Sequence, residues 1–201
     1  MPKIVDHAQR RNEIALVACR VVAEHGFDQA SMVRIAREAG YTTGMLAHYF
    51  ESKQDIIIAA LRLILTRIEA RLTKPAAGGA QDLQAVLTET LPIDAQRYIE
   101  CAFWTAFWGQ VSADKRLRRI NNWLHREYMR LFKRCVAEGW PEWTDWSATV
   151  REQVLRSIVT FINGITASAV VNPGDWPAQR QVEQLRLQLT LLRAWAKKTG
   201  R

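Results

Sequence analysis

The sequence contains few of the residues on which most catalytic and metal chemistry depends. Its 201 residues include only three cysteines and four histidines. Cys19, Cys101 and Cys135 are odd in number and far apart, so they predict neither a disulfide framework nor a metal-binding spacing. The histidines are scattered, and no nucleophile elbow, phosphate-binding loop, dinucleotide fingerprint or His-Glu-x-x-His motif occurs. We therefore expect a protein that is not an enzyme and holds no metal or cofactor.

Long apolar runs are also missing. No unbroken apolar run approaches the roughly 18 residues that span a membrane. The first six residues, Met1-Pro-Lys-Ile-Val-Asp6, lack the apolar stretch of a secretory signal. Hydrophobic residues still make up 48% of the chain, enough for a folded core. These features predict a cytoplasmic protein with no membrane partner.

Strand patterns are absent as well, because no segment sustains a two-residue alternation and no Asn-Gly hairpin turn occurs. Helical spacing predicts an all-α fold with helices over 7–25, 32–39, 43–50, 53–72, 81–91, 94–111, 114–138, 147–171 and 178–197. The segment Lys74–Ala80 is the clearest break, and it predicts a joint before a larger helical body. We expect an N-terminal domain over 1–52 and a larger helical domain over 53–201.

The net charge of +8 favours an anionic partner such as nucleic acid, although its distribution does not locate the contact. Residues 1–74 hold 11 Lys and Arg against 8 Asp and Glu, a net charge of only +3. A denser basic run lies further along, at Lys115, Arg116, Arg118, Arg119, Arg126, Arg130, Lys133 and Arg134. For most of this run, a solvated helix face is the favoured interpretation.

Ser31 to Lys53 has the layout of a helix-turn-helix: a cap, a short helix, the turn Ala39-Gly40-Tyr41, a second cap at Thr42 and another short helix. The alternative is an ordinary helix pair in an all-α core. The outward residues predicted after Thr42 are Thr43, Met45, Ala47 and His48. They form a poor stripe for burial and are small enough to meet base edges in the major groove.

The stretch from Ser31 through Ile35-Ala36, Ala39-Gly40, Thr42-Thr-Gly44, His48-Tyr49-Phe50 and Lys53 to Ile56 closely resembles the signature of the TetR family of repressors. This resemblance implies a three-helix DNA-binding module joined to a helical body that binds an effector and dimerises. Two positions depart from the pattern: Tyr41 replaces the usual valine, and Ala47 replaces a frequent aromatic residue.

By this resemblance, Thr43, Met45 and His48 are predicted to contact bases, and Ser31, Arg34, Tyr49 and Lys53 to contact phosphates. For Arg34, a solvated surface arginine is an equal alternative. Thr42, Gly44 and Ala47 complete the predicted DNA-facing set. The partner is then double-stranded DNA carrying a palindromic operator.

The chain is rich in tryptophan, with eight copies. Each large aromatic can be simple core packing, but together they suit a cage for a cation, because ring faces attract quaternary ammonium groups. The stretch Trp104-Thr-Ala-Phe107-Trp108 and the triplet Ile162-Asn163-Gly164 are similar to the choline-responsive BetI subgroup. Asn163 is either a polar anchor or an amide satisfied between helices. The predicted ligand residues are Tyr98, Phe103, Trp104, Phe107, Trp108, Trp123 and Asn163.

The last two long helices carry apolar residues on more than one face, which favours a homodimer. The predicted interface residues are Leu155, Ile158, Ile162, Leu185, Leu189 and Leu192. A fully internal core is the alternative. The sequence thus predicts a dimeric repressor released by a small effector, such as choline or a related quaternary ammonium in betaine metabolism. A repressor answering an unrelated apolar or cationic ligand, in efflux or catabolic control, is the second prediction.

Overall fold

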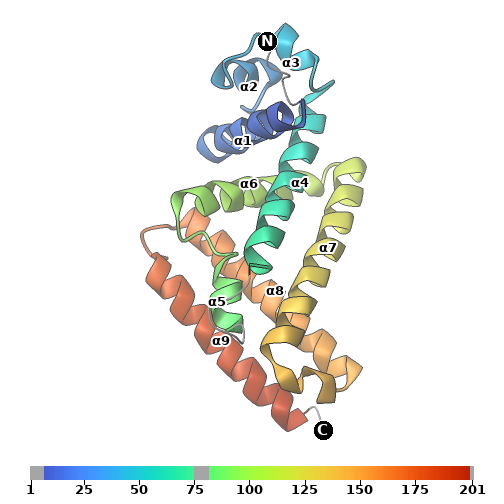
Figure 1. Ribbon diagram of the computed structural model, residues 1–201. Helices are drawn as coiled ribbons and strands as arrows, with labels where there is room; N and C mark the ends of the chain where they lie inside the picture. Colours follow the sequence, from blue (N-terminus) through green and yellow to red (C-terminus); the bar gives the residue numbers. More distant parts are fainter. Residues whose placement is uncertain (1–6, 75–81, 200–201) are drawn as a thin grey trace. The chain divides into compact units, whose positions relative to one another are not determined.

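A computed structural model describes residues 7–74 and 82–199, and over these ranges it consists of helices without a strand (Figure 1). The predicted all-α class is confirmed. The helices are α1 (His7–His25), α2 (Met32–Glu38), α3 (Thr43–Ala47), α4 (Lys53–Leu72), α5 (Leu83–Thr88), α6 (Ala95–Val111), α7 (Lys115–Gly139), the 3-10 helix η1 (Pro141–Asp145), α8 (Ala148–Val171) and α9 (Ala178–Thr199).

The chain forms two compact units. The first comprises Met1–Thr66 with Ala102–Asn121, and the second comprises Arg67–Cys101 with Asn122–Arg201. The helices α4, α6 and α7 each contribute residues to both units, so the units divide the chain at places other than residue 52. The domain boundary at 52/53 stays a prediction. Most of the predicted joint, residues 75–80, lies outside the described residues.

In the first unit, α1 packs on α2 and α2 packs on α3. The ends of α1 and α2 are marked by Gly26 and Gly40, whose φ angles are +80° and +73°. Only glycine adopts this region without strain, which is why both helices end there. The largest fully buried side chains of this unit are Ile14, Ile35, Leu46, Phe50, Ile56, Ile57, Leu61, Ile64, Phe103 and Phe107.

In the second unit, α8 packs against α9, and α5 packs against α9 (Figure 1). Nine of the 24 residues of α8 are buried, at positions spaced three and four apart, as expected for a helix that packs one face into a core. By length and composition α8 is also apolar enough to cross a membrane, which the search for unbroken apolar runs missed. Its burial against α9 gives it the character of a core helix.

The second unit contains a buried carboxylate that is paired with two arginines. Glu100 is 3% exposed, and its two carboxylate oxygens lie 3.1 Å from Arg67 Nη1 and 2.8 Å from Arg71 Nη2. A carboxylate buried to this extent requires such partners, because desolvation alone would cost several kcal/mol. Beside it, burial raises the pKa of the Cys101 thiol to about 12. The thiol is therefore protonated at neutral pH and is a poor nucleophile.

At the far end of α7, three tryptophans form a buried cluster around η1. Trp146 makes edge-to-face contacts with Trp140 and Trp143 at ring-centroid distances of 5.8 and 6.0 Å. Glu142 fastens this cluster to α9, because its carboxylate accepts hydrogen bonds of 2.5 and 3.0 Å from the Arg193 guanidinium. These bonds hold the pKa of Glu142 at about 2.

Replacing Glu142 with glutamine should reduce the free energy of unfolding by about 1 to 2 kcal/mol at pH 7, the usual size for charge-assisted bonds. Because the folded pKa lies below the ordinary value of 4.5, this stability is present above pH 4.5 and is lost as the pH falls toward 2. Urea unfolding at a series of pH values measures the difference.

The matched control is Glu152→Gln on α8, where the ion pair with Arg156 is largely exposed. That change should cost under about 0.5 kcal/mol. A deficit for Glu142→Gln that stays constant down to pH 2.5 would contradict the assignment.

Candidate nucleic-acid interface

The short helices α2 and α3 are each held at their first turn by a side-chain cap. Ser31 Oγ accepts a hydrogen bond of 3.2 Å from the Arg34 backbone N–H, and Thr42 Oγ1 accepts one of 3.1 Å from Met45 N–H. Between the helices, Gly40 makes the turn. The helix-turn-helix layout predicted from Ser31 onward is therefore present in the structure.

Helix α3 presents nearly all of its side chains to solvent. Leu46 is its only fully buried residue and anchors it to the unit. The exposed residues are Thr43, Gly44, Met45, Ala47 and the capping residue His48. Met45 is 48% exposed. The helix ends at Ala47 rather than near residue 50, because the His48 and Tyr49 N–H groups bond to carbonyls three residues back, those of Met45 and Leu46, as in a tighter 3-10 turn. An exposed helix anchored at one point is a shape that can enter a groove.

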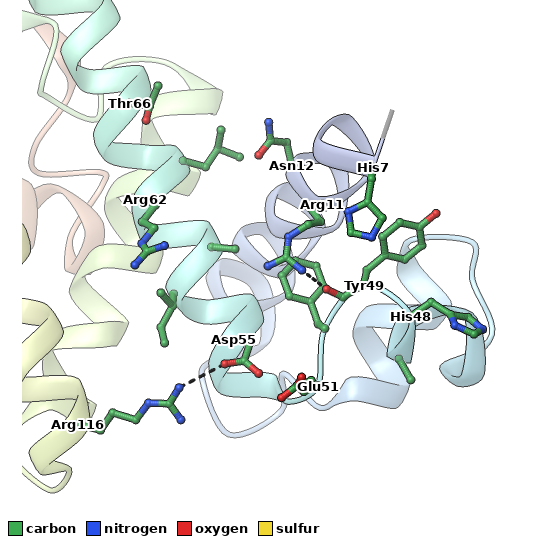
Figure 2. Close-up of a pocket in the computed structure, with 15 residues that line it drawn as sticks. His7, Arg11, Asn12, His48, Tyr49, Glu51, Asp55, Arg62, Thr66 and Arg116 are labelled. Atoms are coloured by element: carbon green, nitrogen blue, oxygen red, sulfur yellow. Dashed lines mark hydrogen bonds and ion pairs between the residues drawn. The ribbon is translucent and has the colours of Figure 1, made fainter. Parts of the chain in front are cut away.

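Tyr49 follows α3 and is fixed by its surroundings. Its ring lies 4.9 Å from the His7 ring and 6.1 Å from the Tyr41 ring, and its carbonyl accepts a hydrogen bond from Arg11. Figure 2 shows the Tyr49 and His48 side chains directed away from Asp55 and Arg62. A tyrosine held in this way can offer its hydroxyl to a neighbouring group at little cost in side-chain entropy.

Lys53, predicted to contact phosphate, already has a partner. Its ammonium donates a 2.6 Å hydrogen bond to the Phe27 carbonyl and lies 4.6 Å from the centroid of the Phe27 ring. Partial burial lowers its pKa. An ammonium group has three donors, so two remain for a phosphate. Among the other predicted phosphate contacts, Ser31 is exposed and Arg34 is half-buried.

A cleft of about 850 Å³ lies beside α3 in the first unit (Figure 2). Arg11 and Arg62 line it, and across it Arg116 forms a 3.3 Å ion pair with Asp55. Arg11 lies over the Phe50 ring at 4.0 Å. Sequence reasoning missed Arg11, although its place on the first turns of α1, ahead of the buried face, was a signal that it would be half-exposed.

The first turn of α4 is tied to the connection between α6 and α7. Gln54 donates a 3.3 Å hydrogen bond to Asp114, and Arg116 bonds to Gln54 at 3.1 Å and to Asp55 at 3.3 Å. All of these residues belong to the first unit. A movement of the α6–α7 connection would therefore be felt at the start of α4, directly after the exposed helix.

The predicted ligand residues fall in both units. In the first, Trp104 contacts Phe107 at 6.1 Å and Trp108 at 6.2 Å between ring centroids, while Phe103 and Phe107 are fully buried. In the second, the Tyr98 hydroxyl donates to the Val170 carbonyl at 3.4 Å. Within that unit Trp123 is 38% exposed, more than an enclosed cage wall would leave.

Among the described residues the Asn163 side chain makes no hydrogen bond, and both interpretations of this residue stay predictions. The set as a whole stays a prediction.

Most of the predicted dimer residues are covered by their own chain, and their place in a dimer interface stays a prediction. Leu155, Ile158, Ile162, Leu185 and Leu189 are each buried within the single chain, because α8 and α9 pack these faces against each other and the body core. Only Leu192 is half-exposed. Side chains that are already buried add little further apolar area to a contact with a partner. The apolar residues that remain exposed on α9 are Leu187, Leu191 and Trp195, spaced four apart.

Two family models match the chain. The model for bacterial regulatory proteins of the tetR family matches residues 14–60, and the model for the BetI-type transcriptional repressor C-terminal domain matches residues 79–194. The second match covers more than half of the chain. This chain belongs to the TetR family. Its body is of the BetI type, and the family consists of transcriptional regulators rather than enzymes, as the sequence predicted.

Curated relatives agree with this membership. The chain is 25% identical over 182 residues to the HTH-type transcriptional regulator BetI 1 of Chromohalobacter salexigens, covering 86% of this chain and 85% of that protein. It is 33% identical over 110 residues to the regulator PksA of Bacillus subtilis, covering 53% of this chain. It spans about half, 54%, of the length of PksA.

Solved structures share the fold of this TetR-family chain. A transcriptional regulator from Rhodococcus sp. Rha1 superposes with a TM-score of 0.79 at 22% identity, covering 92% of this chain and 97% of that one. A regulator from Saccharomonospora viridis, solved in complex with choline, gives a TM-score of 0.70 at 18% identity, covering 89% and 94%. At these identities the likeness supports the architecture alone.

Proposed function

We propose that this TetR-family regulator is a homodimeric repressor that binds a palindromic operator in double-stranded DNA and is released by a small effector. The observation that carries the proposal is the exposure of Thr43, Met45 and His48 on a capped helix anchored only through Leu46. Side chains of this size suit direct contact with base edges in the major groove. Tyr49 and Lys53, with Ser31 and Arg34, then hold the phosphates on either side.

The dimer face that we propose is the outward side of α8 and α9. A groove of about 590 Å³ runs between these helices, lined by Phe161, Gly164, Ser168, Gln184 and Gln188 among others. The exposed Leu191 (56%) and Leu187 (51%) provide apolar area on α9. Two such pairs of helices can form a four-helix bundle, whose two-fold axis would present two copies of α3 to a palindrome.

The effector that we propose is a quaternary ammonium such as choline, acting in the cytoplasm. Three features support this class: the BetI type of the body, the adjoining rings of Trp104, Phe107 and Trp108, and a structural relative that binds choline. The effector releases DNA only by binding one conformation better than the other. The bonds of Gln54 and Arg116 at the start of α4 give that change a route to α3.

Adding choline to the complex of protein and fluorescent operator DNA should lower the DNA anisotropy and change the intrinsic tryptophan fluorescence over the same concentration range. A ring cage recognises the positive charge. The uncharged isostere 3,3-dimethyl-1-butanol, which has the same shape, should therefore have at least about ten times less effect, the ratio expected for ~1.4 kcal/mol of cation–π attraction. No response at millimolar choline would overturn the effector assignment and leave DNA binding untouched.

A further inference from the structure

Apart from Arg116, the basic residues of α7, the most basic helix of the chain, have no part in the proposed repressor mechanism. Helix α7 contains eight Lys and Arg and two Glu, so it carries six of the chain's eight net positive charges. Within the second unit, Arg126, Arg130 and Lys133 follow one another at spacings of four and three residues. They lie along one face of the helix, and we call them the basic stripe.

The basic stripe is held outward by the opposite face of the same helix. Leu124, Leu131, Phe132 and Val136 are buried, whereas the three stripe residues and the neighbouring Arg134 are exposed. Because the buried face is packed in the core, α7 cannot rotate to hide these charges. The basic surface is therefore a fixed feature of the body.

The charge of the stripe is poorly compensated. Arg130 pairs with Glu127 at 2.5 Å, but Arg126, Lys133 and Arg134 make no hydrogen bond or ion pair with any residue in the ranges 7–74 and 82–199. Like charges held this close repel each other, and an anionic partner would relieve that repulsion.

We propose that the basic stripe binds double-stranded DNA independently of sequence, as a second contact separate from α3. The stripe extends about 10 Å along the helix, and DNA presents a phosphate charge about every 1.7 Å of its axis. An anionic membrane fits less well, because Trp123 is the only large apolar side chain of α7 that is exposed to insert. An acidic protein fits less well because no apolar centre accompanies the charges. The inference rests on the proposed function only in taking DNA as the partner.

The test compares the full-length protein with the triple variant Arg126→Gln, Arg130→Gln and Lys133→Gln. Binding to long non-operator DNA is measured over a range of salt concentrations. Each lost phosphate contact reduces the magnitude of the slope of log K against log salt by about 0.9. The magnitude of the slope should therefore be smaller for the variant by about 2 to 3 for each engaged stripe. Binding to a short operator duplex, just long enough for two α3 contacts, should change less than about twofold.

A matched control removes the same charge from α9 through Arg186→Gln, Lys197→Gln and Lys198→Gln, all at exposed positions. Its slope should fall by less than about 1. Equal slopes for the two triple variants would overturn the proposal and leave a solvated face. The proposal would also be overturned if the stripe variant lost sedimentation with phosphatidylglycerol vesicles but lost no binding to DNA. Failure of the unmodified protein to bind the operator duplex would count against the proposed function instead.

Discussion

Replacing Thr43, Met45 and His48 together with alanine should raise the dissociation constant for the operator by at least about 100-fold. Each lost base contact costs about 1 to 3 kcal/mol of discrimination, and a dimer loses both copies. The three side chains are exposed, so the fold should be unaffected. Fluorescence anisotropy on operator and scrambled duplexes at one salt concentration measures the effect, because phosphate contacts hold both duplexes while base contacts hold only the operator.

The comparison variant is Lys53→Ala, which removes a phosphate contact from the same surface. It should weaken binding to the operator and the scrambled duplex by the same factor and reduce the salt slope by about 1 per protomer. If the triple alanine variant also weakened both duplexes equally, α3 would not be the helix that reads the bases.

Replacing Gly164 with arginine should convert the proposed dimer to a monomer and lower operator affinity by more than about 100-fold, because the second half-site no longer binds at high effective concentration. A Cβ added at Gly164 meets nothing within 4 Å in the chain, and the residue lines the groove between α8 and α9. The new side chain therefore obstructs a partner and not its own fold. Size-exclusion chromatography with light scattering gives the mass, and thermal unfolding followed by circular dichroism tests the fold.

Gly109→Arg is the matched control, because Gly109 also lies in a helix and a Cβ there also meets nothing within 4 Å. It should remain dimeric. A Gly164→Arg protein with the mass of two chains would place the dimer face elsewhere.

The helical fold and the helix-turn-helix of α2 and α3 could be predicted, because the sequence features that mark them are local. Ser31 and Thr42 cap the first turns, Gly26 and Gly40 take positive φ, and the three- and four-residue spacing of apolar side chains marks the buried faces. The end of α3 was wrong by about three residues. The His48 and Tyr49 N–H groups bond three residues back instead of four, and no residue type distinguishes such a turn from another turn of α-helix.

The proposed dimer face could not be separated from the core by sequence pattern. On α8 and α9 both surfaces are apolar, and the pattern selected Leu155, Ile158 and Leu185, which the chain buries by itself. Which apolar face stays exposed depends on how α8, α9 and α5 pack in three dimensions, and the local sequence pattern does not contain this information. The four-residue spacing of Leu187, Leu191 and Trp195 is present in the sequence. It does not differ in residue type from the spacing of the buried Leu185 and Leu189, and only the packing of other helices distinguishes the two faces.

The partner of Lys53 was hidden for a similar reason. Its ammonium group binds the Phe27 carbonyl, 26 residues earlier, and a backbone acceptor leaves no mark in the sequence. The family pattern identified the residue, while the structure adds that only two of its donors are available to DNA. The same holds for Arg11, whose contact with the Tyr49 carbonyl joins α1 to the residue after α3.

The central claim, that this chain reads a palindromic DNA site through α3, is tested most directly by DNase I footprinting on the DNA upstream of its own gene. The account predicts one protected region with two symmetric halves, centred about 10 base pairs or a multiple apart, which is lost in the Thr43, Met45 and His48 alanine variant. Absence of any protected region at low salt, or protection that persists unchanged in that variant, would contradict it.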